Sequence, residues 1–349
     1  MAAHAFELAG GDPHRFEMTA PPAFASDEMA AELIELYWRT LTRDVPFDSY
    51  ADHPLTTAAV RDLSRCAAFR GPRVGNAVTP GTLFRGPTPG DLTGPYLSQF
   101  LWLDLPHGNM RLVQRGRAPV AGEEWLAIQR GALAPRITVI DPVRRHIRNS
   151  RDLTAYLHLD QSHQTFLDAC AILLVMGAPF KPDYQHFPRR SRTQSGCVTF
   201  GVPHVLDCVA RVAYAARKAT RCQKWLVHPT HPSDPAGRAA IAGACTTVLK
   251  AFFDETFVIP DPVVASADGT SLVPWDGAPL TVGGELNKLA SNIALGRDAA
   301  GVHYRSDGIE SLTLGEAVAT GILQELRRTC TEAFSGFAFT RFDGDTTRA

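Results

Sequence analysis

Residues 295–307 read LGRDAAGVHYRSD, and they follow an apolar helical pattern with an arginine, a histidine and an aspartate inside one short turn. Arg297 stands four residues after Ile293 and extends the apolar face of that helix. Because a guanidinium keeps its proton, an arginine on a face that points to the core needs an anion beside it. His303 precedes Asp307 by four residues, a spacing that lets the carboxylate hold one imidazole nitrogen and leaves the other for a metal or a proton. A carboxylate partner for Arg297 and a purely structural histidine are the alternatives.

Two earlier stretches add a helix N-terminus and a lysine. The run HPSDPAGRAAIAGACTTVLKAFF at 231–253 has a capping serine or aspartate, a proline at the first helical position and then small residues. Open amides near Ala236 and Gly237 would favour an oxyanion, and a tight helix crossing without a ligand is the alternative. In ATRCQKWLVH, residues 219–228, Lys224 ends an apolar helix, where a solvated lysine is the alternative.

The periodicity of the whole chain predicts an all-α protein. Apolar residues at helical spacing predict helices over the ranges 26–41, 56–66, 93–103, 122–130, 151–177, 203–228, 235–254 and 284–297. A capping box from Thr313 to Glu316 predicts the start of a last helix that runs to about residue 331. Between them lie long loops rich in proline and glycine, and one small hairpin is expected at 263–273 around Asp268 and Gly269. Since no repeat or linker divides the chain, a single domain over 1–349 is expected.

Composition limits the classes of partner. The 349 residues are 45% hydrophobic and carry a formal net charge of -1, so no basic field is present for a nucleic-acid backbone. The first residues lack the pattern of a secretory signal, and no apolar run reaches the length of a membrane span. Seven cysteines occur without a CxxC pair, which is typical of reduced thiols. A cytoplasmic location is therefore expected.

The pattern formed by Arg297, a glycine, His303 and Asp307 resembles the last signature of the vanadium-dependent haloperoxidases. This family shares its helical fold with the type 2 phosphatidic acid phosphatases. PTHPSDPAGRAAIAGA at 229–244 resembles the middle signature, and QKWLVH at 223–228 resembles the start of the lysine segment. Similar stretches continue upstream in LYWRTLTRDVPF, GTLFRGPTPGDLTGPYLSQFLW and RDLTAYLHLDQSHQ, so the resemblance extends over nearly the whole chain and is closest to the bromoperoxidase-like branch.

The resemblance implies a role for each matched residue. His303 would bind vanadium in a vanadate ion, with Asp307 holding its other ring nitrogen. Arg297 and Lys224 would neutralise oxygens of the ion, and the amide of Gly237 would donate to another; phosphate could replace vanadate. Such enzymes use hydrogen peroxide and a halide, here bromide, to make a hypohalous acid that halogenates small organic molecules. The metal works as a Lewis acid, and relatives often form homo-oligomers.

The chain departs from the family pattern in two ways that predict impaired activity. Arg238 stands where the family has an acid/base histidine, and a guanidinium cannot exchange protons at ordinary pH. Ala236 replaces a serine of the same signature. Second, KWLVH runs directly into PTHPS, so a segment of several tens of residues, with one oxyanion-binding arginine, is expected to be absent between about 228 and 229. Arg238 is a candidate to replace that lost charge.

Three other interpretations remain open. A non-catalytic oxyanion-binding relative would keep the fold after losing its acid/base group. A phosphatase on the same scaffold would use His303 as the nucleophile, although Arg238 is a poor proton donor for the leaving group. A separate metal site at His228 and His231 is disfavoured by the prolines beside them and by the lack of a third ligand nearby.

Overall fold

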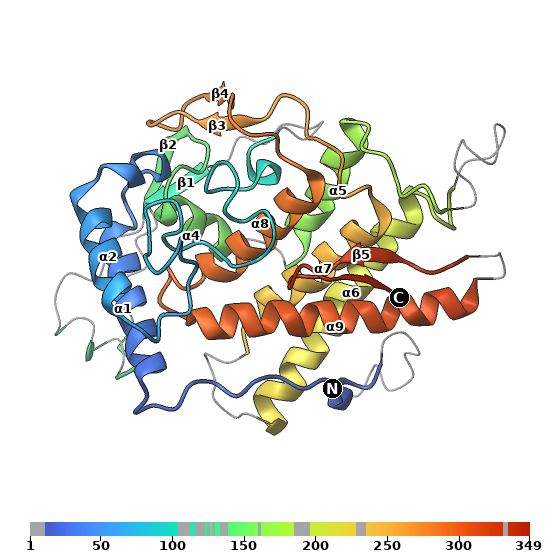
Figure 1. Cartoon of the computed structure of the whole chain (residues 1–349), viewed down its shortest axis with the longest axis horizontal. Coiled ribbons are helices and arrows are strands. Elements are labelled where there is room, and N and C mark those ends of the chain that lie inside the picture. Colours follow the sequence, from blue (N-terminus) through green and yellow to red (C-terminus); the bar gives the residue numbers. More distant parts are fainter. Residues whose placement is uncertain are drawn as a thin grey trace.

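The computed structural model describes residues 11–103, 112–115, 123, 126–127, 130–132, 139–159, 162–184, 196–227, 235–330 and 334–349 (Figure 1). The α-helices in these ranges are α1 (Asp27–Thr42), α2 (Pro54–Arg65), α4 (Ser150–Leu159), α5 (Gln164–Val175), α6 (Val202–Cys222), α7 (Gly237–Phe252), α8 (Val282–Gly296) and α9 (Arg305–Thr329). Short 3-10 turns are η1 (Pro13–Arg15), η2 (Phe47–Ala51) and η3 (Gln99–Leu101), and a π-helical turn, η4 (Gln223–Val227), follows α6. The predominance of helix confirms the all-α prediction.

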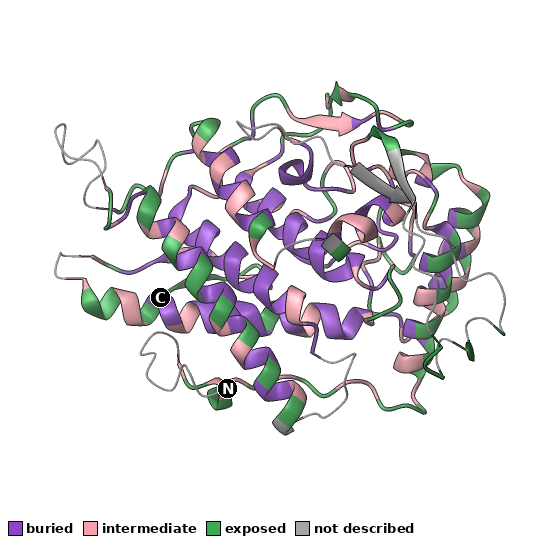
Figure 2. Cartoon of the chain, turned by 180° about the vertical axis from the view of Figure 1, so that it is seen from behind, coloured by how far each residue is buried: buried purple, intermediate pink, exposed green. Residues whose placement is uncertain are grey.

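Helix α7 lies at the centre of the core. All of its residues from Ala239 to Phe252 are buried, and it contacts α6, α8 and α9. A Cβ atom added to Gly315 of α9 would overlap the carbonyl oxygen of Ala240 and lie 2.7 Å from the amide nitrogen of Ala244. The small residues of α7 therefore let the backbone of α9 make direct contact with it. Figure 2 shows the buried residues, in purple, running through these central helices.

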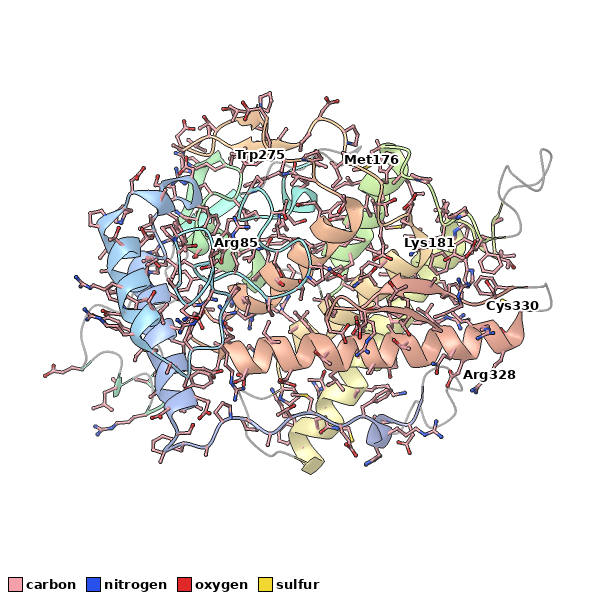
Figure 3. The ribbon with its side chains drawn as sticks, in the orientation of Figure 1. Arg85, Met176, Lys181, Trp275, Arg328 and Cys330 are labelled. Atoms are coloured by element: carbon pink, nitrogen blue, oxygen red, sulfur yellow. The ribbon has the colours of Figure 1, made fainter. Side chains whose placement is uncertain are left out.

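Helices α1 and α2 form a second apolar cluster at one end of the molecule, opposite the C-terminal end of α9 (Figure 1). Helix α1 begins after Ser26, whose hydroxyl accepts a hydrogen bond from the Met29 amide at 3.2 Å, as its capping residue predicts. Arg328 and Cys330 mark the far end of α9 in Figure 3. None of the helices in the described ranges combines the length and the apolar character that crossing a bilayer demands.

One expected helix is wrong and one is interrupted. The range 93–103 contains only η3, because Gly94 has φ +72 and precedes a proline. The range 151–177 is divided between α4 and α5, where Ser162 has φ +47 and cannot continue a right-handed helix. Most of the range 122–130 lies outside the described residues.

The last helix begins earlier than its expected capping box. Helix α9 starts at Arg305, where Asp307 accepts a hydrogen bond from the Tyr304 amide at 2.9 Å. Thr313 instead donates its hydroxyl to the carbonyl of Ile309 inside the helix, and Glu316 accepts from the Phe342 amide. The box at Thr313 is wrong because threonine side chains also bond to carbonyls one turn back within a helix.

Three antiparallel hairpins lie on the helices in the described ranges. The expected one is present: β3 (Val263–Ala265) pairs with β4 (Leu272–Pro274), and Gly269 in its turn has φ +72. The other two are β1 (Leu112–Arg115) with β2 (Val139–Arg144), and β5 (Ala338–Thr340) with β6 (Thr346–Arg348). Strands of three residues, as in β5 and β6, are too short for an alternation of apolar and polar residues to predict them from the sequence. Gly344, with φ +95, lies in the turn between these two strands.

Candidate functional site

Five of the six predicted site residues line one pocket of about 300 Å³. The end of α6 and η4 provide Lys224, the start of α7 provides Gly237 and Arg238, and the turn between α8 and α9 provides Arg297 and His303. Its other lining residues are Ser162, Arg217, Thr220, Arg221, Trp225 and Ile241. Residues separated by up to 141 positions in the sequence, from 162 to 303, thus face one cavity.

Asp307, the sixth predicted residue, lies behind His303 and outside the pocket lining. Its Oδ2 is 3.4 Å from Nδ1 of His303, and it also accepts the hydrogen bond from the Tyr304 amide. The side chain of Asp307 is 2% exposed, whereas that of His303 is 10% exposed. The carboxylate is thus held by the first turn of α9 and orients one ring nitrogen, so Nε2 is the nitrogen left for a ligand.

Arg297 is the C-terminal cap of α8, a helix whose residues from Glu285 to Gly296 are all buried. The next residue, Asp298, points away from the pocket toward Arg39 of α1, with 3.9 Å between its Oδ2 and Nη2 of Arg39. Burial raises the pKa of Asp298 well above its usual range, against the opposing effect of the Arg39 guanidinium. Arg297 itself is half-buried and contributes its charge to the pocket.

The prediction that the amides near Ala236 and Gly237 are open to an oxyanion agrees only in part with the structure of the start of α7. The amide of Ala236 donates to Oγ of Ser311 at 2.8 Å, so it is already occupied and that part of the prediction is wrong. Gly237, the first residue of α7, lines the pocket at the positive end of the helix dipole. Ala236 is the N-cap of α7, without a side-chain capping bond, so the expected caps Ser233 and Asp234, which lie outside the described residues, and the expected first position of Pro235 are wrong.

Two basic residues of the pocket were not predicted from the sequence. Arg217 and Arg221 precede Lys224 by seven and three positions, and this spacing places all three on one face of a helix. The pocket therefore has five basic side chains, Arg217, Arg221, Lys224, Arg238 and Arg297, and no acidic one among its described lining residues. The periodic spacing of the arginines was the signal that could have found them.

A buried charge cluster fixes the turn that carries Arg297 and His303. Oε1 of Glu35 in α1 accepts hydrogen bonds from Arg39 at 2.9 Å and from Arg305 at 2.6 Å. Arg39 also donates to the carbonyl of Leu295 at the end of α8. Burial alone would raise the pKa of Glu35, but the Arg305 and Arg39 guanidiniums outweigh it and lower the pKa to about 2.

Glu32, one turn before Glu35, extends this cluster to the next residue of α9. It accepts hydrogen bonds from the amide and the hydroxyl of Ser306 at 3.0 and 2.9 Å. Burial raises the pKa of Glu32, although the two hydrogen bonds from Ser306 oppose that shift. Helix α1 therefore holds the end of α8 and the start of α9 in a fixed relation.

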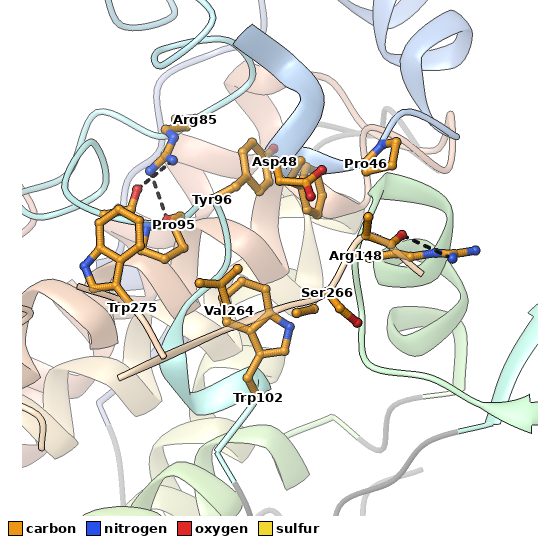
Figure 4. Close-up of a pocket in the computed structure, with 14 residues that line it drawn as sticks. Pro46, Asp48, Arg85, Pro95, Tyr96, Trp102, Arg148, Val264, Ser266 and Trp275 are labelled. Carbon is orange, nitrogen blue, oxygen red and sulfur yellow. Dashed lines mark hydrogen bonds between the residues drawn. The ribbon is translucent and has the colours of Figure 1, made fainter. Parts of the chain in front are cut away.

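A second pocket, of about 230 Å³, has a different chemical character (Figure 4). Trp102 donates its indole N–H to the carbonyl of Ile147, and Tyr96 donates its hydroxyl to the carbonyl of Phe84. Arg85 donates to three main-chain carbonyls, those of Asp91, Gly94 and Pro95. Because these polar groups are bonded within the chain, the pocket presents mainly apolar walls and does not suit an inorganic oxyanion.

Other metal sites gain no support from the described part of the chain. No group of three or more His, Cys, Asp or Glu side chains that could hold a metal ion occurs there. All seven cysteines are free thiols, in line with the reading of the sequence. His228 and His231 lie outside the described residues.

Comparisons with known proteins identify the family of this chain. A family model described as the second helical-bundle domain of VCPO matches residues 213–332, a range that contains every predicted site residue. The vanadium-dependent bromoperoxidase of Corallina pilulifera is 31% identical, over 98% of this chain and 77% of the relative. That of Ascophyllum nodosum is 30% identical, over 99% of this chain and 76% of the relative. The chain belongs to the vanadium-dependent haloperoxidase family.

The solved structures of this family include one with the same fold. The homohexameric structure of the second vanadate-dependent bromoperoxidase from Ascophyllum nodosum matches with a TM-score of 0.81 and 24% identity, over 97% of this chain and 74% of that one. The alignment with the Corallina pilulifera haloperoxidase runs over 465 residues, whereas this chain has 349. The relative therefore contains residues that have no counterpart in this chain.

Proposed function

We propose that this chain oxidises halide, bromide in particular, with hydrogen peroxide at a bound vanadate, and that the resulting hypohalous acid halogenates small organic molecules. The observation that supports this most is the meeting of Lys224, Arg297 and His303 in one pocket whose described lining has basic side chains and no acidic one. The relatives, which are vanadium-dependent bromoperoxidases, support the choice of vanadate and bromide.

The residues of the pocket fit an oxyanion of vanadium. In this proposal His303 is the metal ligand, through the ring nitrogen that Asp307 does not hold. Arg297 and Lys224 neutralise oxygens, and the amide of Gly237 donates to another. Vanadate supplies Lewis acidity toward peroxide when bound. The fixed cations lower the electrostatic cost of bringing a halide to a site that already holds an anion. Phosphate, a tetrahedral oxyanion, is expected to occupy the same place.

Arg238 has two opposite effects in this proposal. Its guanidinium adds a positive charge to the pocket. In this proposal that charge compensates for the oxyanion-binding arginine expected to be lost with the missing segment. It cannot accept a proton from peroxide, however, because it stays protonated. Slow turnover is therefore expected.

Titration with vanadate tests the charge role of Arg238. Replacement of Arg238 by alanine should weaken vanadate binding about tenfold, the loss expected for one charge-assisted hydrogen bond. The control is Arg211→Ala, which removes an arginine of α6 that pairs with Asp207 and does not line the pocket. Equal affinity in the wild type and Arg238→Ala would contradict the role.

Arg238 also favours a second candidate, an oxyanion-binding relative without catalysis, because a guanidinium stands where the family pattern has its acid/base histidine. A phosphatase with His303 as the nucleophile is the third. Purified protein with vanadate, peroxide and bromide, assayed for bromination of a dye, separates them. Turnover supports halide oxidation, bound vanadium without turnover supports the second, and hydrolysis of a phosphate ester without vanadium supports the third.

We also propose that residues 1–349 form one domain, that a segment is missing between about 228 and 229, and that copies of the chain associate. The length of the alignment with the Corallina pilulifera relative supports a missing segment. The homohexamer named for the Ascophyllum nodosum protein supports association. Light scattering on the purified chain tests the last point, and a monomer at micromolar concentration would contradict it.

A further inference from the structure

Arg217 and Arg221 give the pocket more positive charge than one oxyanion requires. Both are exposed, and both line the pocket beside the residues assigned above to vanadate. Arg217 donates from Nη1 to Oγ of Ser162 at 3.2 Å, which orients its guanidinium. Among the described residues, no carboxylate pairs with either arginine. Lys224, Arg297, Arg238 and His303 already provide the compensation that a multiply charged oxyanion needs, so these two charges are in excess.

The pocket also has room beyond an inorganic ion. Its 300 Å³ reaches the lower end of the range of about 300–1,000 Å³ found for sites that take organic ligands. Arg217 and Lys224 are seven residues apart on one helical face, which separates their backbones by about 10 Å along the axis. Trp225, which is 60% exposed, adds an aromatic surface to the same lining. An organic ligand could therefore place its anionic group against the arginines and its apolar part against Trp225.

We infer that Arg217 and Arg221, with Ser162 beside them, form a second anion subsite that takes the carboxylate, sulfonate or phosphate group of an organic substrate. The planar guanidinium groups match such anions through paired hydrogen bonds. The organic part lies against Trp225, next to the place where hypohalous acid is formed. This inference rests on the proposed function for the position of the reaction, but the subsite itself is tested by binding alone.

Calorimetric titration of the purified full chain with 4-hydroxybenzoate and with phenol tests the subsite. The two probes differ only by the carboxylate. The wild type should bind 4-hydroxybenzoate more tightly than phenol, and the double variant R217A/R221A should lose at least about tenfold of the 4-hydroxybenzoate affinity. Phenol should bind equally to both proteins. The control Arg211→Ala, on the same helix but outside the pocket, should leave both affinities unchanged.

The outcomes separate the subsite from the proposed function. Vanadate affinity of R217A/R221A should stay within about threefold of the wild type at 0.15 M ionic strength, where the Debye length is about 8 Å. Equal binding of the two probes to the wild type, or unchanged 4-hydroxybenzoate binding in the double variant, would overturn the subsite. Tight 4-hydroxybenzoate binding by a chain that binds no vanadate would keep the subsite and overturn the halide-oxidising function.

Discussion

The side chain at position 238 sets which chemical group the start of α7 offers to the pocket. Arg238 lines the pocket at the start of α7, next to the predicted oxyanion donor Gly237. A guanidinium supplies charge and hydrogen bonds at all ordinary pH values, whereas an imidazole both gives and takes protons near neutrality. In the proposed halide-oxidising site, a histidine at this position would add proton exchange, whereas Arg238 supplies charge alone.

Replacement of Arg238 by histidine should therefore increase bromination. A positioned acid/base group typically contributes about 10²-fold or more, so dye bromination at pH 6 to 7 should rise by about two orders of magnitude over the wild type. Arg238→Lys is the control, since it keeps the positive charge without an acid/base group that titrates near neutrality. Equal bromination rates for the histidine and lysine variants would contradict the prediction that a missing acid/base group at position 238 limits the reaction.

Helix α1 acts at the scale of the element by joining α8 to α9. Glu35 and Arg39 are both buried, and they bond to Arg305 and to the carbonyl of Leu295. Because breaking a buried ion cluster leaves an uncompensated charge, it costs far more than breaking an exposed pair. The turn with Arg297 and His303 lies between these anchors.

Glu35→Gln should lower the free energy of unfolding by about 3 kcal/mol and weaken vanadate binding. The charge of Glu35 compensates two buried guanidiniums, and its loss should loosen the turn between α8 and α9. Urea unfolding and vanadate titration measure the two effects. Asp207→Asn, which breaks an exposed pair with Arg211 on α6, should cost less than about 0.5 kcal/mol. A similar small loss for Glu35→Gln would show that α1 does not fix the turn.

Two glycines of α9 form a matched pair for testing the contact with α7. A Cβ atom at Gly315 would meet the backbone of Ala240, whereas one at Gly321 has no neighbour within 4 Å. Gly315→Ala should therefore destabilise the protein by about 2 kcal/mol through overpacking. Gly321→Ala should be neutral or stabilise it by up to about 1 kcal/mol, because alanine is the better helix former. Thermal unfolding of both variants measures this, and equal effects would contradict the close contact.

At the scale of the whole molecule, a buried lysine makes stability depend on pH. Lys250 of α7 donates to Oδ1 of Asn287 and to the carbonyl of Thr340, so it links the core helices to the C-terminal hairpin. Burial lowers its pKa to about 8 from 10.5, although the Glu316 and Glu255 carboxylates oppose the shift. The folded chain therefore binds fewer protons than the unfolded chain between these two pH values.

The unfolding free energy should consequently rise between pH 8 and 10.5 by up to about 3 kcal/mol from this group alone. Lys250→Met removes the titration and provides the reference, because the remaining groups titrate in both proteins. Urea unfolding at pH 7.5, 9 and 10.5 should give a difference between wild type and variant that grows in favour of the wild type as the pH rises. Parallel profiles would contradict a lowered pKa for Lys250.

The sequence by itself determined the helical class, the expected hairpin and the chemical types in the site. These depend on periodicity, on turn residues and on spacing within one element, as in the four positions from His303 to Asp307. The sequence-based prediction of helix starts was wrong where one residue type occurs both at a helix cap and inside a helix. Thr313 looks like a cap but bonds back to Ile309 within α9.

Only the tertiary structure decided which residues meet. Arg217 and Arg221 are ordinary positions of α6 in the sequence, and only the packing of α6 and α7 with the turn after α8 brings them to the pocket of Arg297 and His303. The cluster between α1 and α9 likewise joins Glu35 to Arg305 across 270 positions. Such contacts follow from how buried faces fit against each other, and a local pattern does not contain that information.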